Sequence, residues 1–529
     1  MRITNKIMQN NNLANINTNK LLQDRLSTQM STEKKINRPS DDPVVAIRAL
    51  RLRSNVTEVT QYYTKNIPDA ESWLKVTEES LKTLSDIVTA MQKQCTNGAK
   101  DYLESSDRLT IIEQLKALAD EVYTTGDADY AGRYVFTGYR TDTSLSFPDT
   151  TELQYRITEQ LDKNAIDQVT VITTHSAGAG GANDVTDVMD MTTNNYKNLT
   201  VKKEDVQAVE AYRFRLAYGS CDSTETPAPK IEYQERAANG TYSTQTIEAE
   251  IVHDYESPYE QIANLPDGEV KAFFVPETGE MLLSKGAYDK LMATKDDAST
   301  PGTNEGEIRI TYDKTNWTKG DLRPEHYFYC ETNPDDEDAK IINNPTYLTG
   351  NVEHQEIEYD VGFNQTIRIN STADECFKHG IGREVEDLVN AMQDVVDTEK
   401  IVNDLKALLK TSSGAEAEEI QQKLDVAQKV LDMKSNKAQK MFEHGITVMQ
   451  NHLDDTNLSI TNTGTRSRKL ELIENRMQSQ KTTFETLKSE NEDVDITEVI
   501  INLTSAKLTY EASLMATSKV VQTSLLQFL

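Results

Sequence analysis

The sequence predicts an α+β protein: a long antiparallel helical coiled-coil bundle from the N- and C-terminal segments, with a β-rich domain inserted between them. Two long segments, one near each end, place apolar residues every three or four positions, which is the spacing of a coiled-coil seam. Between about residues 141 and 370 this period fades and turn dipeptides appear. A hydrophobic fraction of 37% with 27% charged residues suits long helices with thin cores.

A marked turn, NRPSDDP at residues 37–43, precedes the first seam. Asp41 or Asp42 is expected to accept hydrogen bonds from free N–H groups of the first helical turn. Pro43 suits the first helical position, where its missing N–H costs nothing. Adjacent carboxylates could also form a metal or acid–base pair, but capping is the favoured interpretation beside a proline. The predicted cap and turn therefore comprise Pro39, Asp41, Asp42 and Pro43.

The first seam runs in two parts that are separated by a stutter at Ile67. Pro68 predicts a kink or short break near Asn66, because proline cannot donate a helical hydrogen bond. Asn97-Gly98 is a suitable helix end. Such a helix needs partners of similar length. The seam positions are Val45, Ala49, Leu52, Val56, Val59, Tyr63, Ala70, Leu74, Leu81, Leu84, Val88 and Met91.

The C-terminal half mirrors this pattern. Helix is expected to return at about Ser371, to break at residues 412–414 and to resume near Ala415 as a very long helix. An acidic turn at residues 491–495 precedes the last helix. The second seam comprises Ile420, Leu424, Ala427, Leu431, Ala438, Phe442, Gly445, Met449, His452, Leu470, Ile473, Met477, Phe484 and Leu487.

The two ends of the chain carry the predicted assembly surface. Residues 1–34 are polar with sparse apolar positions, so their helix should be marginal alone in water. The last helix carries an apolar stripe into its final turn, although termini normally fray. We therefore predict that both ends are buried against another subunit. The predicted interface comprises Ile3, Ile7, Leu13, Leu503, Tyr510, Leu514, Val521, Leu525 and Phe528.

The middle of the chain is predicted to be β-rich, as one or two domains. Asn239-Gly240 separates two strand-like runs and so predicts a hairpin. A second hairpin is predicted around Thr278-Gly279. Residues 133–139, before this region, are expected to form a short strand or hairpin edge. The strand candidates are residues 231–233, 246–251, 270–275, 281–283, 307–312, 327–330, 357–361 and 366–369.

Composition excludes several functions. A formal charge of −30 argues against nucleic-acid binding, because phosphate would be repelled. No apolar run approaches the roughly 20 residues of a membrane span, and the first residues lack the apolar core of a secretory signal. We expect no membrane contact, and a chain that is either cytoplasmic or exported without a cleaved signal.

No motif for catalysis or for a cofactor stands out. The four cysteines are scattered and form no CxxC pair. The seven histidines show no HExxH or His-x3-His spacing, so solvated or core histidines are expected instead of a zinc site. The glycine-rich stretch at residues 177–182 lacks the Lys-Ser/Thr of a phosphate loop. A Ser-His-Asp or Cys-His arrangement cannot be recognised from spacing. The prediction is no enzyme, no cofactor and no metal.

Several segments together resemble the bacterial flagellin-like axial proteins. They are MRIT at residues 1–4, INRPSDDP at 36–43, QYYTKNI at 61–67, VFTG at 135–138 and SLLQFL at 524–529. The resemblance covers roughly residues 1–140 and 375–529.

The sequence of the turn at residues 36–43 distinguishes two branches of this family. In filament flagellins it usually continues Asp-Asp-Ala-Ala-Gly-Leu-Ala, whereas Asp42 here is followed by PVVA. Pro39 also replaces the small residue that flagellins tend to have. Both features are similar to the hook–filament junction branch. Residues 31–34 lack the glycine that is common before this turn, which leaves the local loop shape open.

The resemblance implies a structural subunit of the junction between hook and filament. Terminal helices (residues 1–40 and 495–529) would be disordered in the monomer and form the inner tube on assembly. Residues 41–140 and 371–494 would form the helical bundle with a short β-hairpin, and 141–370 the variable insert.

The resemblance also implies binding partners and an export route. They are copies of the chain in a ring, the other hook-associated junction protein on the hook side, flagellin on the filament side, and an export chaperone at the C-terminal end. Export would use the flagellar type III apparatus, and the protein would be secreted to the flagellum. Two alternatives stay open: a filament flagellin, or an axial mount for an adhesive or enzymatic insert.

Overall fold

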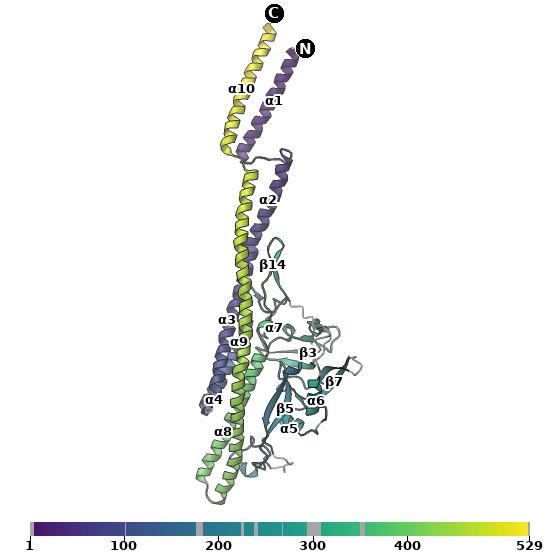
Figure 1. Ribbon diagram of the computed structural model, residues 1–529, viewed down its shortest axis with the longest axis vertical. Coiled ribbons are helices and arrows are strands. Elements are labelled where there is room, and N and C mark those ends of the chain that lie inside the picture. Colours follow the sequence, from purple (N-terminus) through teal and green to yellow (C-terminus); the bar gives the residue numbers. More distant parts are fainter. Residues whose placement is uncertain are drawn as a thin grey trace. The chain divides into compact units, whose positions relative to one another are not determined.

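The structure is a computed structural model that describes residues 5–100, 102–175, 184–223, 227–236, 242–266, 268–293, 308–349 and 355–526. Long helices occupy both ends of the chain, and most strands fall between them in sequence (Figure 1). The predicted α+β class is confirmed. The antiparallel coiled-coil bundle and the domain limits stay predictions. The α-helices are α1 (Asn5–Thr32), α2 (Pro43–Gln61), α3 (Ile67–Gly98), α4 (Ser105–Gly126), α5 (Pro258–Ala263), α6 (Lys285–Ala293), α7 (Ala373–Cys376), α8 (Gly380–Thr411), α9 (Ala415–Glu492) and α10 (Ile496–Leu526).

Ten strands form one sheet in the order β12-β11-β3-β10-β6-β7-β8-β9-β5-β4, and two hairpins, β1–β2 and β13–β14, stand apart. All neighbouring strands of the large sheet are antiparallel except β7 and β8. The strands are β1 (Asp129–Tyr130), β2 (Arg133–Tyr134), β3 (Thr151–Leu161), β4 (Ile166–Ile172), β5 (Ala208–Arg215), β6 (Lys230–Arg236), β7 (Tyr242–Ile251), β8 (Ala272–Val275), β9 (Glu280–Leu283), β10 (Ile308–Trp317), β11 (Tyr329–Thr332), β12 (Ile341–Asn343), β13 (Glu358–Gly362) and β14 (Gln365–Arg368).

Two predicted hairpins are confirmed. β6 pairs with β7 with Ile231 opposite Ile247, and β8 pairs with β9 with Phe274 opposite Met281. Gly279 has φ +63° in the second turn, a conformation that favours glycine. The Asn239-Gly240 turn lies outside the described residues. Strands β3, β4 and β5 were not predicted.

The chain divides into two compact units. The terminal unit comprises Met1–Glu71, Tyr359–Ile367 and Ser467–Leu529, and the central unit comprises Ser72–Glu358 and Arg368–Arg466. Helices α3 and α9 contribute residues to both units.

Helix α2, in the terminal unit, begins at a capped turn. Asp42 has an extended backbone, with φ −153°, and its carboxylate accepts hydrogen bonds from the N–H groups of Val44 and Val45 at 3.0 and 3.1 Å. Pro43 is the first helical residue. This arrangement satisfies two N–H groups that have no helical partner.

Asp41 has a different role in the same turn. Its carboxylate accepts hydrogen bonds from the backbone N–H groups of Arg38 and Asn37, at 3.0 and 3.2 Å, which lower its pKa. Pro39 lies between these donors and the acceptor in sequence and is exposed. Asp41 therefore shapes the turn, whereas Asp42 caps the helix.

Replacing Asp42 with alanine is expected to destabilise the protein by about 1 kcal/mol, because Val44 and Val45 lose their acceptor. Urea unfolding followed by circular dichroism measures the change. Asp42→Asn keeps an acceptor oxygen and should retain most of the stability. An alanine variant as stable as the parent would rule out a stabilising cap.

The predicted kink near Asn66 is a π-helix, Tyr62–Asn66, between α2 and α3. The helix continues through Pro68 with a wider turn, because Ile67 donates to the Tyr62 carbonyl. The β13–β14 hairpin contacts this segment. Asn66 donates to the Asp360 carbonyl at 2.8 Å, and the Tyr62 and Phe363 rings lie 5.8 Å apart.

Helices α3, α8 and α9 pack closely in the central unit. The second half of the first seam is fully buried from Leu74 to Met91. At Gly98 a Cβ atom would lie 2.3 Å from the Phe442 ring, so glycine allows α3 and α9 to approach. The predicted break at residues 412–414 separates α8 from α9, and α9 begins at Ala415 as predicted.

All four cysteines are free thiols. Cys95, Cys330 and Cys376 are buried and Cys221 is half-buried. Burial raises the pKa of each thiol to about 12. Each thiol is therefore protonated at neutral pH, which disfavours reaction as a nucleophile.

Candidate functional site

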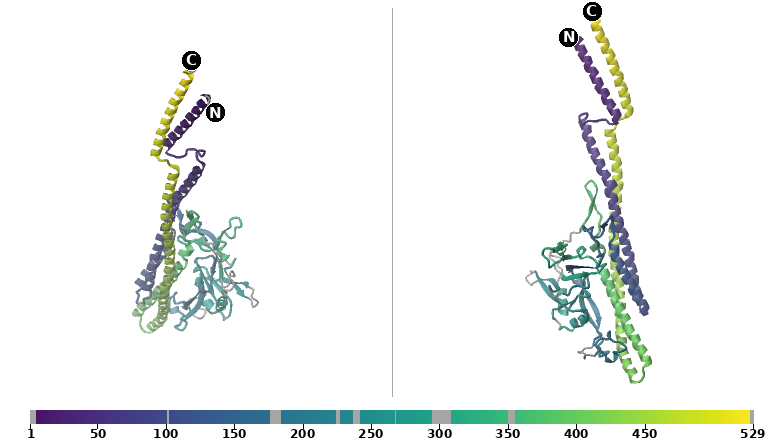
Figure 2. Two further views of the ribbon diagram at one scale, coloured as in Figure 1. Left: turned by 45° about the horizontal axis from the view of Figure 1, so that its top comes forward. Right: turned by 180° about the vertical axis from the view of Figure 1, so that it is seen from behind.

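Helices α1 and α10 lie side by side in the terminal unit, as Figure 2 shows from two directions. Their shared core is small: Leu26, Val499 and Ala506 are buried, and Val494 and Leu503 pack against them. Farther along the pair, the Asn19 amide donates to the Ser513 hydroxyl at 3.2 Å. Little apolar surface is therefore buried within this pair itself.

The predicted assembly residues lie mostly on the outside of this pair. Ile7, Leu13 and Leu514 are exposed, whereas Leu503 and Tyr510 are half-buried. The side chains of Val521 and Leu525, like residues Ile3 and Phe528, lie outside the described part of the structure. Further exposed apolar residues of these helices, which were not predicted, are Met8, Leu21, Leu22, Met30, Ile496, Ile500, Ile501, Leu508 and Met515.

Charged residues fix the base of the pair. Glu492 ends α9 and is 2% exposed, and Arg53 of α2 holds its carboxylate through two hydrogen bonds of 2.6 and 2.8 Å. Lys34 pairs with Asp493, and the Lys35 N–H donates to the Glu492 carbonyl at 2.8 Å. The two turns that lead into α2 and α10 are thus tied together.

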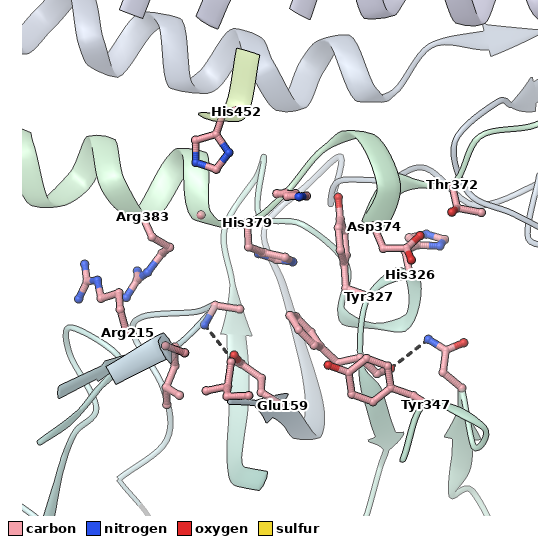
Figure 3. A pocket seen from close by; sticks show the side chains of 18 of the residues that line it. Glu159, Arg215, His326, Tyr327, Tyr347, Thr372, Asp374, His379, Arg383 and His452 are labelled. Carbon is pink, nitrogen blue, oxygen red and sulfur yellow. Dashed lines mark hydrogen bonds between the residues drawn. The ribbon is translucent and has the colours of Figure 1, made fainter. Parts of the chain in front are cut away.

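A second candidate site is a cavity of about 560 Å³ in the central unit (Figure 3). His326, His379 and His452, three of the seven histidines, line it together with Tyr327 and Phe328. His354 lies outside the described residues. Sequence spacing could not reveal this group, because its members come from separate elements and meet only in the fold.

The cavity histidines are neutral at physiological pH. Burial lowers the pKa of His379 to about 3, with a further contribution from Arg383, and lowers the pKa of His326 to about 4. Burial also lowers the pKa of His452. The ring of His379 is packed against Tyr327 and Phe328, with centroids 4.3 and 5.2 Å away. Each neutral imidazole keeps one nitrogen as an acceptor.

Buried ion pairs join strand β5 to helix α8 near the cavity. Arg213 pairs with Glu280 and Asp387, and Arg215 lies 3.1 Å from Asp387 and 3.3 Å from Glu280. Burial alone would raise the pKa of Glu280, but Arg213 and Arg215 hold it below its ordinary value. The network stays charged and connects the sheet to the helix.

Glu384 lines the cavity on α8 and should make stability depend on pH. Burial, with the charges of Asp387 and Asp167, raises its pKa from 4.5 to about 7. The folded chain therefore binds this proton more tightly than the unfolded chain. This contribution to stability is present below about pH 4.5 and is lost as the pH rises to about 7.

Glu384→Gln should consequently stabilise the protein at pH 8, by about 1–3 kcal/mol, and change little at pH 4. Urea unfolding at both pH values tests this. The exposed Glu418→Gln is the matched control and should have no effect at either pH. A Glu384→Gln variant that loses stability at pH 8 would contradict the prediction.

One cluster has the connectivity of a catalytic triad. His175 Nδ1 lies 3.2 Å from Glu260, and its Nε2 lies 3.1 Å from the Ser257 hydroxyl. Asp187 lies at the same Nε2, also at 3.1 Å, and competes for the nitrogen that would accept the serine proton. Pro258, which follows the serine, has no N–H to stabilise an oxyanion. We assign this cluster a structural role.

Other kinds of site find no support within the described residues. None of their His, Cys, Asp and Glu side chains form a group of three that could hold a metal ion. None of the helices searched has an apolar stretch long enough to cross a membrane.

Residues 3–141 match the family described as the bacterial flagellin N-terminal helical region. Over this region the chain is similar to bacterial flagellins. It is 27% identical over 143 residues to flagellar hook-associated protein 3 of Salmonella typhimurium and 27% identical over 145 residues to that of Escherichia coli. Each alignment covers 27% of this chain and 45% of the relative, so the chain spans less than half the length of either.

Among solved structures, flagellar hook-associated protein 3 of Legionella pneumophila is 9% identical over 83% of this chain and 98% of its own, with a TM-score of 0.28. A score this low does not establish a shared arrangement. The sequence relatives are structural flagellar proteins. The family match and these relatives indicate a flagellar protein.

Proposed function

We propose that the chain is a structural subunit of the hook–filament junction and has no catalytic role. The exposed apolar surface of α1 and α10 carries this proposal. Ile7, Leu13 and Leu514 face away from a core of three buried residues, and burying them against neighbouring subunits would supply the missing stability. The likeness to hook-associated protein 3 supports the junction position.

The proposed assembly is a ring of copies held by helix–helix packing. The partners are the other hook-associated junction protein on the hook side and flagellin on the filament side. Before assembly, an export chaperone would cover the apolar surface of α10. In the free monomer α1 and α10 would be largely disordered, and they would fold on assembly. The coiled-coil bundle and the β-rich insert, residues 141–370, complete the proposed organisation.

Electron microscopy of a deletion strain tests the junction role. We expect hooks without filaments and flagellin shed into the medium, both restored by the intact gene. Normal filaments in the deletion strain would contradict the proposal. Copy number separates the near alternative, because a junction ring needs few subunits per flagellum and a filament flagellin needs very many.

The axial-mount alternative, in which the insert carries an adhesive or enzymatic activity, is favoured by one observation, the cavity of about 560 Å³. Binding of a glycan to the full chain, or its hydrolysis, would support that alternative.

A further inference from the structure

The cavity of the central unit is large enough for a small molecule and is lined in part by aromatic rings. Phe328 lies 6.1 Å from Tyr347 and 5.2 Å from His379, centroid to centroid, and Tyr327 lies 4.3 Å from His379 and 6.0 Å from Phe328. Figure 3 shows His452 and His379 across from Glu159. The walls therefore combine flat apolar faces with a few polar atoms.

Glu159 of β3 is a buried carboxylate with one oxygen to spare. The side chain is 3% exposed, and its Oε1 accepts hydrogen bonds from the Ala217 N–H at 2.9 Å and the Tyr312 hydroxyl at 2.5 Å. Among the described residues, none donates to Oε2. Glu159 lines the cavity, so Oε2 is available to a donor on a ligand.

Glu384 of α8 is a second open acceptor. No described residue is seen to form a hydrogen bond or ion pair with its carboxylate, although the residue is half-buried. The charged groups around it are Asp387 on its own helix, Asp167 on β4, and Arg213 and Arg215 on β5. Both arginines are already paired with other carboxylates, so Glu384 lacks a cation of its own.

The cations that line the cavity are already paired, although the Nε atoms of Arg215 and Arg383 have no hydrogen-bond partner. Arg215 donates to the Thr278 carbonyl at 2.7 Å besides its ion pairs. Arg383 binds Glu386 at 2.7 Å and the same carbonyl, and Lys378 binds Asp455 at 2.5 Å. Each of these three cations is balanced by a carboxylate, whereas the carboxylates of Glu159 and Glu384 can accept further hydrogen bonds, so the cavity favours a cationic ligand over an anionic one.

We propose that this cavity binds a small organic amine in its protonated form. The ammonium group donates to Glu159 and Glu384, and the aliphatic part lies against Tyr327, Phe328 and Tyr347. Aromatic faces attract a cation through their negative quadrupole, which adds to the two carboxylates. A diamine or polyamine reaches both acceptors. The proposal is independent of the junction role.

Isothermal titration calorimetry of the full chain with spermidine, in 150 mM salt at pH 7.5, tests the proposal. We expect saturable binding with one ligand per chain. Because an ammonium ion favours the charged form of Glu384, whose pKa is about 7, binding should release protons. The measured heat should therefore vary with the ionisation enthalpy of the buffer.

Substituted variants distinguish binding in the cavity from nonspecific adsorption of the polyamine to the acidic surface. Glu384→Gln should weaken binding by about tenfold and abolish the proton release, and Glu159→Gln should also weaken it. Glu418→Gln, an exposed change of equal charge, should leave affinity unchanged. Since Glu384→Gln is expected to be at least as stable as the parent, unfolding cannot explain its loss of binding.

Three comparison ligands define the class. Choline carries a positive charge but no N–H donor and should bind more weakly than spermidine, whereas phosphate and glucose should not bind. Spermidine binding that is non-saturable, or equal in the parent, Glu384→Gln and Glu159→Gln, would overturn the proposal. So would tighter binding of phosphate or glucose.

Discussion

Removing about the last 25 residues should abolish assembly while leaving the central unit folded. The deletion removes most of α10, including the exposed Leu508, Leu514 and Met515, whose burial against neighbours is proposed to hold the ring together. Each fully buried side chain of this kind contributes about 1.5–3 kcal/mol. Electron microscopy of a strain carrying the truncated gene should show bare hooks, and circular dichroism should show that the purified chain keeps its β-sheet signal.

A point substitution refines this result. Leu514→Asp places a charge on the apolar surface and should reduce filament attachment severely, because an unpaired charge is costly to bury. Thr509→Asp adds the same charge at an exposed polar position of α10 and should assemble normally. Filaments on the hooks of the truncated strain would refute the role of this helix.

Arg213→Met should destabilise the central unit by about 3–5 kcal/mol. Arg213 is 8% exposed and pairs with Glu280, itself 5% exposed, and with Asp387. Removing the cation leaves buried carboxylates that Arg215 alone cannot neutralise, and an uncompensated buried charge is strongly destabilising. Urea unfolding monitored by circular dichroism measures the loss as a lower midpoint.

Lys82→Met is the matched control, since Lys82 pairs with Glu78 on the surface of α3 in the same unit. Exposed pairs of this spacing contribute about 0.3–0.5 kcal/mol, so this variant should barely shift the midpoint. If the two variants unfold alike, the buried network does not hold β5 to α8.

The long helices could be predicted from the sequence because apolar residues recur every three or four positions over most of their length. The break at residues 412–414, the start at Ala415 and the end of α3 at Gly98 are all confirmed. Strands β3 and β5 were missed for a physical reason. Glu159 and Arg213 are charged and yet buried, since partners from other elements neutralise or bind them, and such residues break the alternation by which strands are recognised.

The cavity could not be predicted from the sequence, because its residues are far apart along the chain. His326, His379 and His452 are separated by dozens of residues, and no local motif connects them. Pairing between distant strands and packing of α8 and α9 bring them together. The assembly residues were recognisable as a stripe, but whether they contact neighbouring subunits stays a prediction, because a single chain contains no neighbour.

The buried thiols bear on the stability of the proposed assembly. With their pKa raised to about 12, the four cysteines present almost no reactive sulfur to oxygen or to other proteins. Disulfide bonds between stacked copies are therefore not expected to form in an oxidising medium. The proposed ring would then be held together by noncovalent contacts, and mild denaturants without a reductant should suffice to dissociate it.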